Sequence, residues 1–444
     1  MIMKSSVARP LRIALVGTRG VPARYGGFET CVEEVGSRLA ERGHEVVVYC
    51  RRLGDDRSAE LPSYKGMSLV HHGAMKRRSL ETLSHTALSV QHLVRHRTDA
   101  AVVFNAGNAP FLPVLRAARI PVATHVDGLE WKRQKWAGAG RRYYLTAERM
   151  AVRWSDALIA DAVGIQDYYR EKFGKPTDLI TYGAPVLDAA GDHRLAELGL
   201  VSGGYHLVVA RFEPENHVDM IVAGYAASNA ELPLVVVGSA PYADAYTQRV
   251  HSLADDRVTF LGGVWDQELL DQLYANAFTY LHGHSVGGTN PSLLRALGAS
   301  AATTAFDVNF NREVLGDAGR FFRTVDDVRS QVEDSEADIA RTVDLGVRAR
   351  IQAGRYDWDE VTDRYEDLCL RLAGRHRTSS VVDHAAELPT DSVNDTLADL
   401  LDGVADEASA APGQPIPVEL PTARPLVPLT GTPDLVAVPV RRSA

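Results

Sequence analysis

Residues 11–51 read LRIALVGTRGVPARYGGFETCVEEVGSRLAERGHEVVVYCR, and this stretch decides the fold. It opens with an apolar run, Leu11–Gly17, of the kind that forms a buried parallel strand. After a glycine-bearing loop, apolar residues recur at helical spacing as far as Gly43, a residue type that favours the end of a helix. A second apolar run follows at His44–Arg51. The order strand, loop, helix, strand predicts a βαβ unit, the building block of a doubly wound parallel sheet.

The same alternation continues through most of the chain, in two series divided near residue 185. Strand-like runs recur at 99–107, 120–128 and 155–161 in the first series, and at 204–215, 231–240, 257–264 and 277–284 in the second. We therefore predict an α/β protein in which two Rossmann-like domains, 10–185 and 186–372, face a central cleft. A helical closing segment is expected at about 343–372.

The composition narrows the class of protein. At 444 residues the chain is too long for one ordinary core, and its 45% hydrophobic and 24% charged residues are typical of a soluble globular protein. The net charge of −9 argues against a nucleic-acid binder, whose surface would be basic. Cys31, Cys50 and Cys369 lack the spacing of a metal site or a disulfide framework, and no run reaches the roughly 18–20 apolar residues of a membrane span. We expect a cytoplasmic protein.

The last part of the chain, 376–444, has a different composition. Nine of the 21 prolines follow residue 388, among alanine, threonine and acidic residues. Such a segment cannot bury enough apolar surface to order itself, so we expect disorder. Within it, residues 391–408 fit either a transient helix or a helix that docks on a partner protein or on the protein's own surface. The apolar face of that helix would consist of Val393, Leu397, Leu400, Leu401 and Val404.

A glycine-rich loop, GTRGVPARYGGFET at 17–30, is the first candidate ligand site. It matches neither the phosphate-loop nor the dinucleotide-binding fingerprint. A simple strand-to-helix turn is one interpretation. The glycines, which permit tight turns and close ligand approach, together with the arginine and tyrosine between them, favour a loop that lines the cleft. The residues concerned are Gly17, Arg19, Gly20, Tyr25, Gly26 and Gly27.

A second glycine-rich stretch, HSVGGTNPSLLRALG at 284–298, reads as a strand end, a turn and the start of a helix. Such a turn points backbone N–H groups at an anion. Gly287, Gly288, Thr289 and Asn290 are the residues that would face it. The first helical turns also carry Arg295, which either helps to hold a phosphorylated ligand or replaces a residue that the chemistry needs.

Five motifs in order resemble a bacterial branch of the family 4 glycosyltransferases that includes rhamnosyltransferases. They are GTRGVPARYGGFET, VDGLEWKRQKW, ARFEPEN, HSVGGTNPSLL and FNREVLGDAG, and the resemblance spans roughly residues 10–372. It implies the GT-B fold, with the donor nucleotide in the second domain and the acceptor mostly on the first. It also implies retention of anomeric configuration, no metal and no cofactor, the nucleotide-sugar being a substrate.

The resemblance implies roles for the second-domain motifs. Arg211 occupies the position at which a family arginine meets the diphosphate, and a guanidinium suits that task. Five residues later, many members have a lysine where this chain has Asn216. Arg295 stands where the branch usually keeps a glutamate that accepts hydrogen bonds from the ribose, and arginine has no acceptor. Arg295 therefore either supplies the missing cation, weakens the donor site, or only packs the helix. Glu313 is a weak substitute for the ribose acceptor.

In the first domain, THVDGLEWKRQKW at 124–136 follows a strand. His125 and Asp127 lie at its carboxyl edge, where ligands of open α/β sheets bind, and the resemblance places acceptor positioning or deprotonation there. A structural role is the alternative for each. Lys132, Arg133 and Lys135, interleaved with Trp131 and Trp136, form a basic aromatic patch. It could meet a lipid-linked acceptor at the membrane surface, or be an ordinary solvated face.

These observations favour a glycosyltransferase that moves a sugar from a nucleotide-diphosphate donor to a cell-surface glycan or lipid-linked acceptor. Rhamnose, from dTDP-rhamnose, is the candidate sugar, and the inner face of the cell membrane is the candidate location. One alternative is an inactive homologue that acts as a binding or scaffold protein, which Arg295 and Asn216 favour. A nucleotide-sugar epimerase is another, against which the YGGFET and VDGLEW motifs speak.

Overall fold

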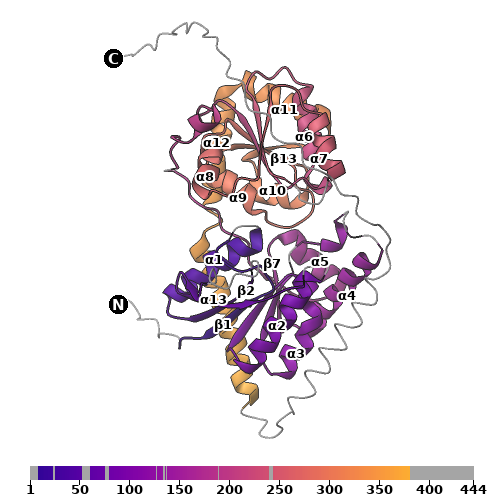
Figure 1. Cartoon of the computed structure of the whole chain (residues 1–444), viewed down its shortest axis with the longest axis vertical. Coiled ribbons are helices and arrows are strands. Elements are labelled where there is room, and N and C mark those ends of the chain that lie inside the picture. Colours follow the sequence, from indigo (N-terminus) through magenta and orange to yellow (C-terminus); the bar gives the residue numbers. More distant parts are fainter. Residues whose placement is uncertain are drawn as a thin grey trace.

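The computed structural model describes residues 9–23, 26–52, 61–75, 80–126, 128–133, 136, 138–188, 190–239 and 244–380. Within them the chain forms two α/β domains, each built on its own sheet (Figure 1). The expected disordered tail therefore lies almost wholly outside the described residues. The two-domain GT-B architecture expected from the alternation of strands and helices is confirmed.

The first domain has an eight-stranded sheet in the order β3-β4-β2-β1-β5-β6-β7-β8, parallel except for the β3–β4 pair. Its strands are β1 Arg12–Val16, β2 Glu45–Arg51, β3 Ser63–Tyr64, β4 Met67–His72, β5 Ala100–Phe104, β6 Val122–His125, β7 Ala157–Ala160 and β8 Asp178–Leu179. Its helices are α1 Gly27–Glu41, α2 Glu81–Arg95, α3 Leu112–Ala117, α4 Ala139–Trp154 and α5 Val163–Phe173. In the centre, β1 and β5 are buried on both faces, as expected of strands between two helix layers.

The second domain has a six-stranded parallel sheet in the order β11-β10-β9-β12-β13-β14. The strands are β9 His206–Val209, β10 Leu234–Val237, β11 Val258–Gly262, β12 Thr279–His282, β13 Ala302–Phe306 and β14 Gly319–Phe322. Its helices are α6 Val218–Ala226, α7 Asp244–Ser252, α8 Gln267–Ala275, α9 Pro291–Gly298, α10 Asn309–Leu315, α11 Val325–Ala337 and α12 Ile339–Ala353. In both sheets the strand carboxyl ends lead into the loops of the domain junction.

The closing segment differs from the expected single helix at about 343–372. After α12 the chain turns, and Asp357 accepts backbone N–H groups from Asp359 and Glu360, which starts a new helix, α13 (Trp358–Ser380). This helix crosses back and packs against α1 of the first domain (Figure 1). The last helix of the chain thus completes the domain in which the chain begins.

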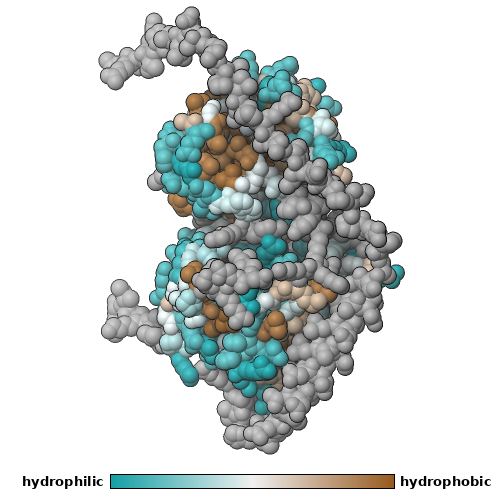
Figure 2. All heavy atoms as spheres, viewed as in Figure 1, coloured by the Kyte–Doolittle hydropathy of each residue, from teal (hydrophilic) through white to brown (hydrophobic). Residues whose placement is uncertain are grey.

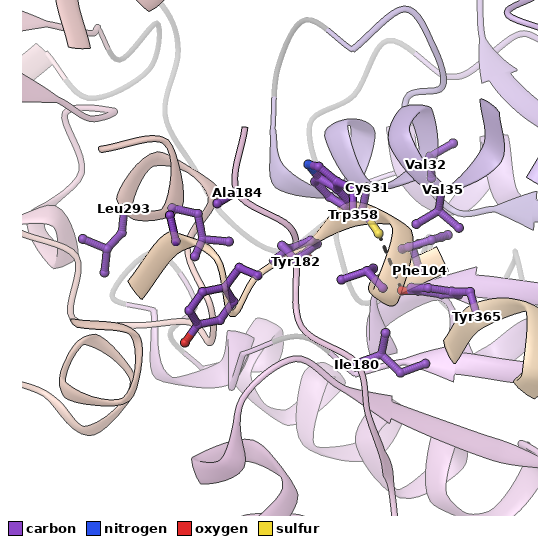
Figure 3. Close-up of a cluster of buried hydrophobic side chains, with 14 of the residues drawn as sticks. Cys31, Val32, Val35, Phe104, Ile180, Tyr182, Ala184, Leu293, Trp358 and Tyr365 are labelled. Atoms are coloured by element: carbon purple, nitrogen blue, oxygen red, sulfur yellow. Dashed lines mark hydrogen bonds between the residues drawn. The ribbon is translucent and has the colours of Figure 1, made fainter. Parts of the chain in front are cut away.

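Where α13 meets the first domain, its contacts are partly apolar and partly charged. Figure 3 shows Trp358 and Tyr365 beside Cys31, with the Tyr365 hydroxyl 3.6 Å from the Cys31 sulfur. Around this buried cluster, Arg38 pairs with Asp359 at 3.0 Å and Arg42 with Asp363 at 2.7 Å. The buried contacts carry the stabilisation, since exposed ion pairs contribute little.

On the second domain, part of the apolar surface stays exposed, as Figure 2 shows by its hydrophobic colouring. Four large apolar residues of α12 recur every four positions and are 54–72% exposed: Ile339, Val343, Val347 and Ile351. One side of α12 therefore faces outward from the described part of the chain.

Gly183 lies where the chain first passes from the first domain to the second, and it packs against Trp358, where the chain returns. A Cβ on Gly183 would lie 2.5 Å from Cγ of Trp358, whose side chain is buried. We expect Gly183→Ala to lower the free energy of unfolding by about 1–3 kcal/mol through overpacking, as measured by urea denaturation. Gly374→Ala, on α13 with open space around it, is the control and should be neutral or slightly stabilising. Equal effects of the two substitutions would contradict the prediction.

Candidate active site

Most of the described site residues predicted from the sequence lie where the carboxyl ends of the two sheets face each other. From the second domain come the β12–α9 turn and the β9–α6 loop. From the first come the ends of β6 and β7 and the start of α1 (Figure 1). Asp127 and Tyr25 lie outside the described residues.

The β12–α9 turn is built as an N-terminal cap. The Asn290 side-chain oxygen accepts the backbone N–H of Ser292 at 3.0 Å and its hydroxyl at 2.7 Å, which starts α9. Gly287 has φ of 145°, a region that favours glycine. Thr289 is buried, and its hydroxyl donates to the backbone carbonyl of Asp161 in the first domain. The turn therefore belongs to the domain junction.

Glycines let the two domains approach closely at this turn. A Cβ on Gly288 would lie 2.5 Å from Cγ of Asp161, and one on Gly128 would lie 2.6 Å from the Cα of Gly287. A Cβ on Gly27, in the first turn of α1, would lie 2.9 Å from Cγ of Pro291, the first residue of α9. At each of these points any larger residue would force the domains apart.

The ARFEPEN loop is tied to the same turn. Asn216 is buried, and its amide donates to the backbone carbonyl of Arg211 at 2.8 Å. The backbone carbonyl of Glu215 accepts both the N–H and the hydroxyl of Ser285, at 2.9 and 3.0 Å. The Arg211 side chain is 43% exposed and lies 3.7 Å from Glu213. Asn216 thus braces the loop, and Arg211 projects from it.

Arg133 crosses the junction from the first domain. Its guanidinium lies 2.7 Å from Glu130, 3.4 Å from Glu215 and 3.9 Å from Glu213. The sequence placed Arg133 in an outward basic patch, but its side chain is only 13% exposed. The acidic residues of ARFEPEN therefore hold this arginine across the domains.

His125 lies at the end of β6 and is fully buried. Its ring stacks on Phe104 and Tyr182, at centroid distances of 5.5 and 5.8 Å, and meets the edge of Phe28 at 5.3 Å. Neither ring nitrogen has a hydrogen-bond partner among the described residues. Burial lowers the pKa of His125 to about 3, so the ring is neutral near pH 7.

The first glycine loop divides into two parts. Gly17 packs on Phe104 and Gly20 on Cys50, both with positive φ, so tight packing and backbone conformation account for these two glycines. The backbone N–H of Arg19 donates to Glu29 at 2.9 Å. At the start of α1, Gly26 lies near Glu29 of the first domain, whereas Gly27 approaches Pro291 of the second.

Arg295 on α9 has an ion-pair partner. Its guanidinium pairs with Asp271 of α8, and the two side chains are 19% and 25% exposed. Nearby, the Tyr280 hydroxyl donates to Ser292 at 3.3 Å. The position that the resemblance assigns to an acidic residue therefore carries one half of an ion pair within the second domain.

Two carboxylates at the junction escaped the sequence analysis in their present roles. Asp161 follows β7, is fully buried and faces Gly288. Both oxygens of Glu313, on α10, accept the backbone N–H of Val163 at 3.0 Å, so Glu313 caps α5 of the opposite domain. Burial raises the pKa of Glu313, against the effect of these backbone hydrogen bonds. The position of Asp161 at a strand carboxyl end was the signal that could have identified it.

The described residues contain no group of three or more potential metal ligands. Among their helices, none combines the length and the apolar character that crossing a membrane requires. The larger of the two described cavities, about 430 Å³, lies at the far side of the second domain and is lined by residues such as Leu187, Asn276 and Ser300. That cavity contains none of the predicted site residues.

The low pKa of His125 gives a pH prediction. Below its ordinary pKa of about 6.5, the unfolded chain binds a proton at this histidine that the folded protein excludes until about pH 3. Stability is therefore lost as pH falls. We expect His125→Phe to make the free energy of unfolding fall less steeply between pH 6 and 4, by about 1 kcal/mol per pH unit, in urea titrations at several pH values. An unchanged slope would mean that folded His125 accepts the proton.

Comparison with known proteins agrees with this geometry. Residues 26–183 match the family model described as Glycosyl transferase 4-like domain. No curated protein sequence matches the chain.

Solved structures share the fold at low identity. They include Anabaena HepE in complex with UDP, at 16% identity over 80% of this chain and 98% of that chain, with a TM-score of 0.64. The sucrose-phosphate synthase from Thermosynechococcus elongatus is 18% identical over 82% and 99%, with a TM-score of 0.69. WaaG, a glycosyltransferase involved in lipopolysaccharide biosynthesis, is 16% identical over 80% and 99%, with a TM-score of 0.62. The chain has the GT-B fold, and its first domain carries the glycosyl transferase 4-like match.

Proposed function

We propose that this protein is a glycosyltransferase that takes a sugar from a nucleoside diphosphate donor. One observation carries the proposal. The glycine turn Gly287–Asn290, at the start of a helix in the second domain, lies directly against the first domain, which matches the glycosyl transferase 4-like model. HepE, which shares the fold, has been solved with UDP and with UDP-glucose. On that likeness, we place the nucleotide-sugar donor of this chain at the Gly287–Asn290 turn.

The donor side would act through backbone and side-chain donors. The N–H groups of the Gly287–Asn290 turn would face the distal phosphate, and Arg211 would approach the diphosphate from the neighbouring loop. Asn216 would hold this loop in place through the Arg211 carbonyl. Such groups stabilise charge on a departing diphosphate, as a retaining transfer without a metal requires.

The acceptor side would be polar but not cationic. Asp161 places a buried carboxylate beside the turn, and a carboxylate accepts hydrogen bonds from sugar hydroxyls. His125 and Asp127 remain candidates for orienting or deprotonating the acceptor hydroxyl. The neutral ring of His125 leaves one nitrogen able to accept a hydrogen bond, which suits orienting a hydroxyl better than taking its proton.

The sugar, acceptor and location follow from the motif resemblance. Rhamnose from dTDP-rhamnose is the candidate donor sugar, and a cell-surface glycan or lipid-linked precursor at the membrane is the candidate acceptor. Trp131 supports the membrane contact, because Lys132 and Arg141 lie over its ring at 5.6 and 5.3 Å. Aromatic rings with basic side chains suit the polar surface of a membrane.

One observation favours a second candidate function. Arg295 offers no acceptor to a ribose and is already paired with Asp271. A homologue that keeps the fold as a binding or scaffold protein would tolerate this change. Nucleotide binding separates the two candidates.

The first test measures thermal unfolding with UDP, dTDP and GDP in turn. We expect at least one nucleotide to raise the Tm by about 2–4 °C when present at a hundredfold excess over its Kd. Arg211→Ala should reduce that shift because it removes the exposed guanidinium. Arg329→Ala, at an exposed arginine on α11, is the matched control and should leave it unchanged. If no nucleotide shifts the Tm and no nucleotide-sugar is consumed, the scaffold function replaces the transferase.

The second test examines position 295. Arg295→Glu would set two carboxylates side by side with Asp271, so we expect a lower Tm. The pair Arg295→Glu/Asp271→Arg restores an ion pair and leaves an acceptor at 295. If the ribose lies there, this double variant should bind the nucleotide roughly tenfold more tightly than the natural protein, by isothermal titration.

Asp271→Arg alone is the control for the double variant, because it alters the same contact without adding an acceptor at 295. Unchanged nucleotide affinity in a stable double variant would place position 295 outside the donor site.

A further inference from the structure

One edge of the first domain is strongly basic, and it lies opposite the candidate active site. In a parallel α/β domain the connecting helices end where the strands begin, and cations are favoured at helix carboxyl ends. Here α2, α3 and α4 all end near this edge with exposed arginines. We call these residues the basic edge: Arg95, Arg97, Arg116, Arg119, Arg149 and Arg153.

Contacts between neighbouring elements show that the basic edge is continuous. Arg97, after α2, donates to the carbonyl of Ala118, after α3. Arg116, on α3, lies 3.5 Å from Asp156, after α4. Asp156 and Asp99, which lie before β7 and β5, offset part of this charge. Neither Arg149 nor Arg153 has an ion pair with any residue that the structure describes.

The C-terminal end of α13 lies at the same edge of the first domain as these arginines. Glu366 lies 2.9 Å from His44, which directly precedes β2, and His44 accepts the backbone N–H of Leu11, directly before β1. Arg371 pairs with Asp178 at the start of β8, at 2.6 Å. Residues after 371 therefore extend past the amino ends of these strands, as the end of α13 in Figure 1 shows.

The sequence that follows α13 has the opposite charge. Residues 381–444 contain ten acidic and three basic residues, so this segment carries −7 of the net −9 of the chain. Six of the acidic residues fall within 391–408, which contains no basic residue. The rest of the protein is close to neutral, and the basic edge is therefore matched by a charge that the same chain supplies.

We propose that the acidic segment 391–408 docks onto the basic edge of the first domain. Only residues 381–390 separate it from the end of α13, and they can span up to roughly 35 Å. A short tether raises the local concentration of the segment to the order of millimolar, so it competes well against an external anionic partner. The indole of Trp154, at the end of α4, offers an apolar contact to the leucines of the segment.

This docking goes beyond the proposed transfer reaction and does not depend on it. It would cover arginines that otherwise attract anionic lipid or other anions, and it would be sensitive to salt because the pairs are exposed. The competing occupant, an anionic lipid surface, is distinguished by the experiment.

The test is a distance measurement between two spin labels on the full-length chain, at Ala117→Cys in α3 and at Ser409→Cys. The native cysteines are buried and do not compete for the label. At 50 mM NaCl we expect a narrow distance distribution. At 1 M NaCl, where the Debye length falls to about 3 Å, we expect the narrow component to fall roughly fivefold.

Two sets of substitutions complete the test. Arg149→Glu/Arg153→Glu on α4 should remove the narrow component, as should replacement of all six acidic residues of 391–408 by their amides. Arg329→Glu/Arg341→Glu, at exposed positions of the second domain, is the matched control and should leave it unchanged. Equal Tm values of the two arginine variants would exclude unfolding as the cause.

The proposal is overturned by a broad distribution in the natural protein at low salt, or by a narrow one that survives Arg149→Glu/Arg153→Glu. A broad distribution combined with binding to phosphatidylglycerol vesicles that requires Arg149 and Arg153 would assign the edge to an anionic surface instead.

Discussion

The contact between the Asp161 carboxylate and the backbone of Gly288 limits how closely the two domains approach, and the candidate site depends on it. Only glycine fits at 288, and the neighbouring approach of Gly128 to Gly287 has the same requirement. Polar contacts close around this point: Thr289 donates to Asp161, and Glu313 caps α5. The glycines therefore allow the two domains to come close, and the polar contacts form only because of that close approach.

The chain itself holds this arrangement by crossing twice between the domains. The first crossing passes Gly183, and the second passes Trp358, whose ring lies against the backbone of Gly183. Because α13 then packs on α1, the second domain is held at both its ends by the first. Movement between the domains would have to occur about the buried cluster formed by these segments, which Figure 3 shows.

Strand periodicity predicted the sheets better than it predicted their edges. The runs at Leu11–Gly17 and His44–Arg51 became β1 and β2 almost residue for residue. Strand β13, Ala302–Phe306, was not predicted, because ATTAF lacks the branched apolar run that marks a buried strand. The return of α13 to the first domain was not predictable, since the apolar face of a helix does not specify which domain will cover it. Local sequence patterns predict helices and strands, whereas long-range packing decides to which domain each of them belongs.

In the candidate site, too, local patterns predicted the turn but not the long-range partners of its side chains. The arginines show this most clearly. Glycine spacing placed the turn at 287–290, but no local pattern pairs Arg295 with Asp271, 24 residues earlier on another helix. Arg133, Arg211 and Arg295 are 13%, 43% and 19% exposed, and carboxylates surround the first and hold the third. An incoming diphosphate would therefore find its cation mainly at Arg211 and its remaining hydrogen bonds at the backbone N–H groups of the Gly287–Asn290 turn. Donor binding would then depend on the backbone geometry of the turn, and the glycine spacing is the sequence feature that predicts this geometry.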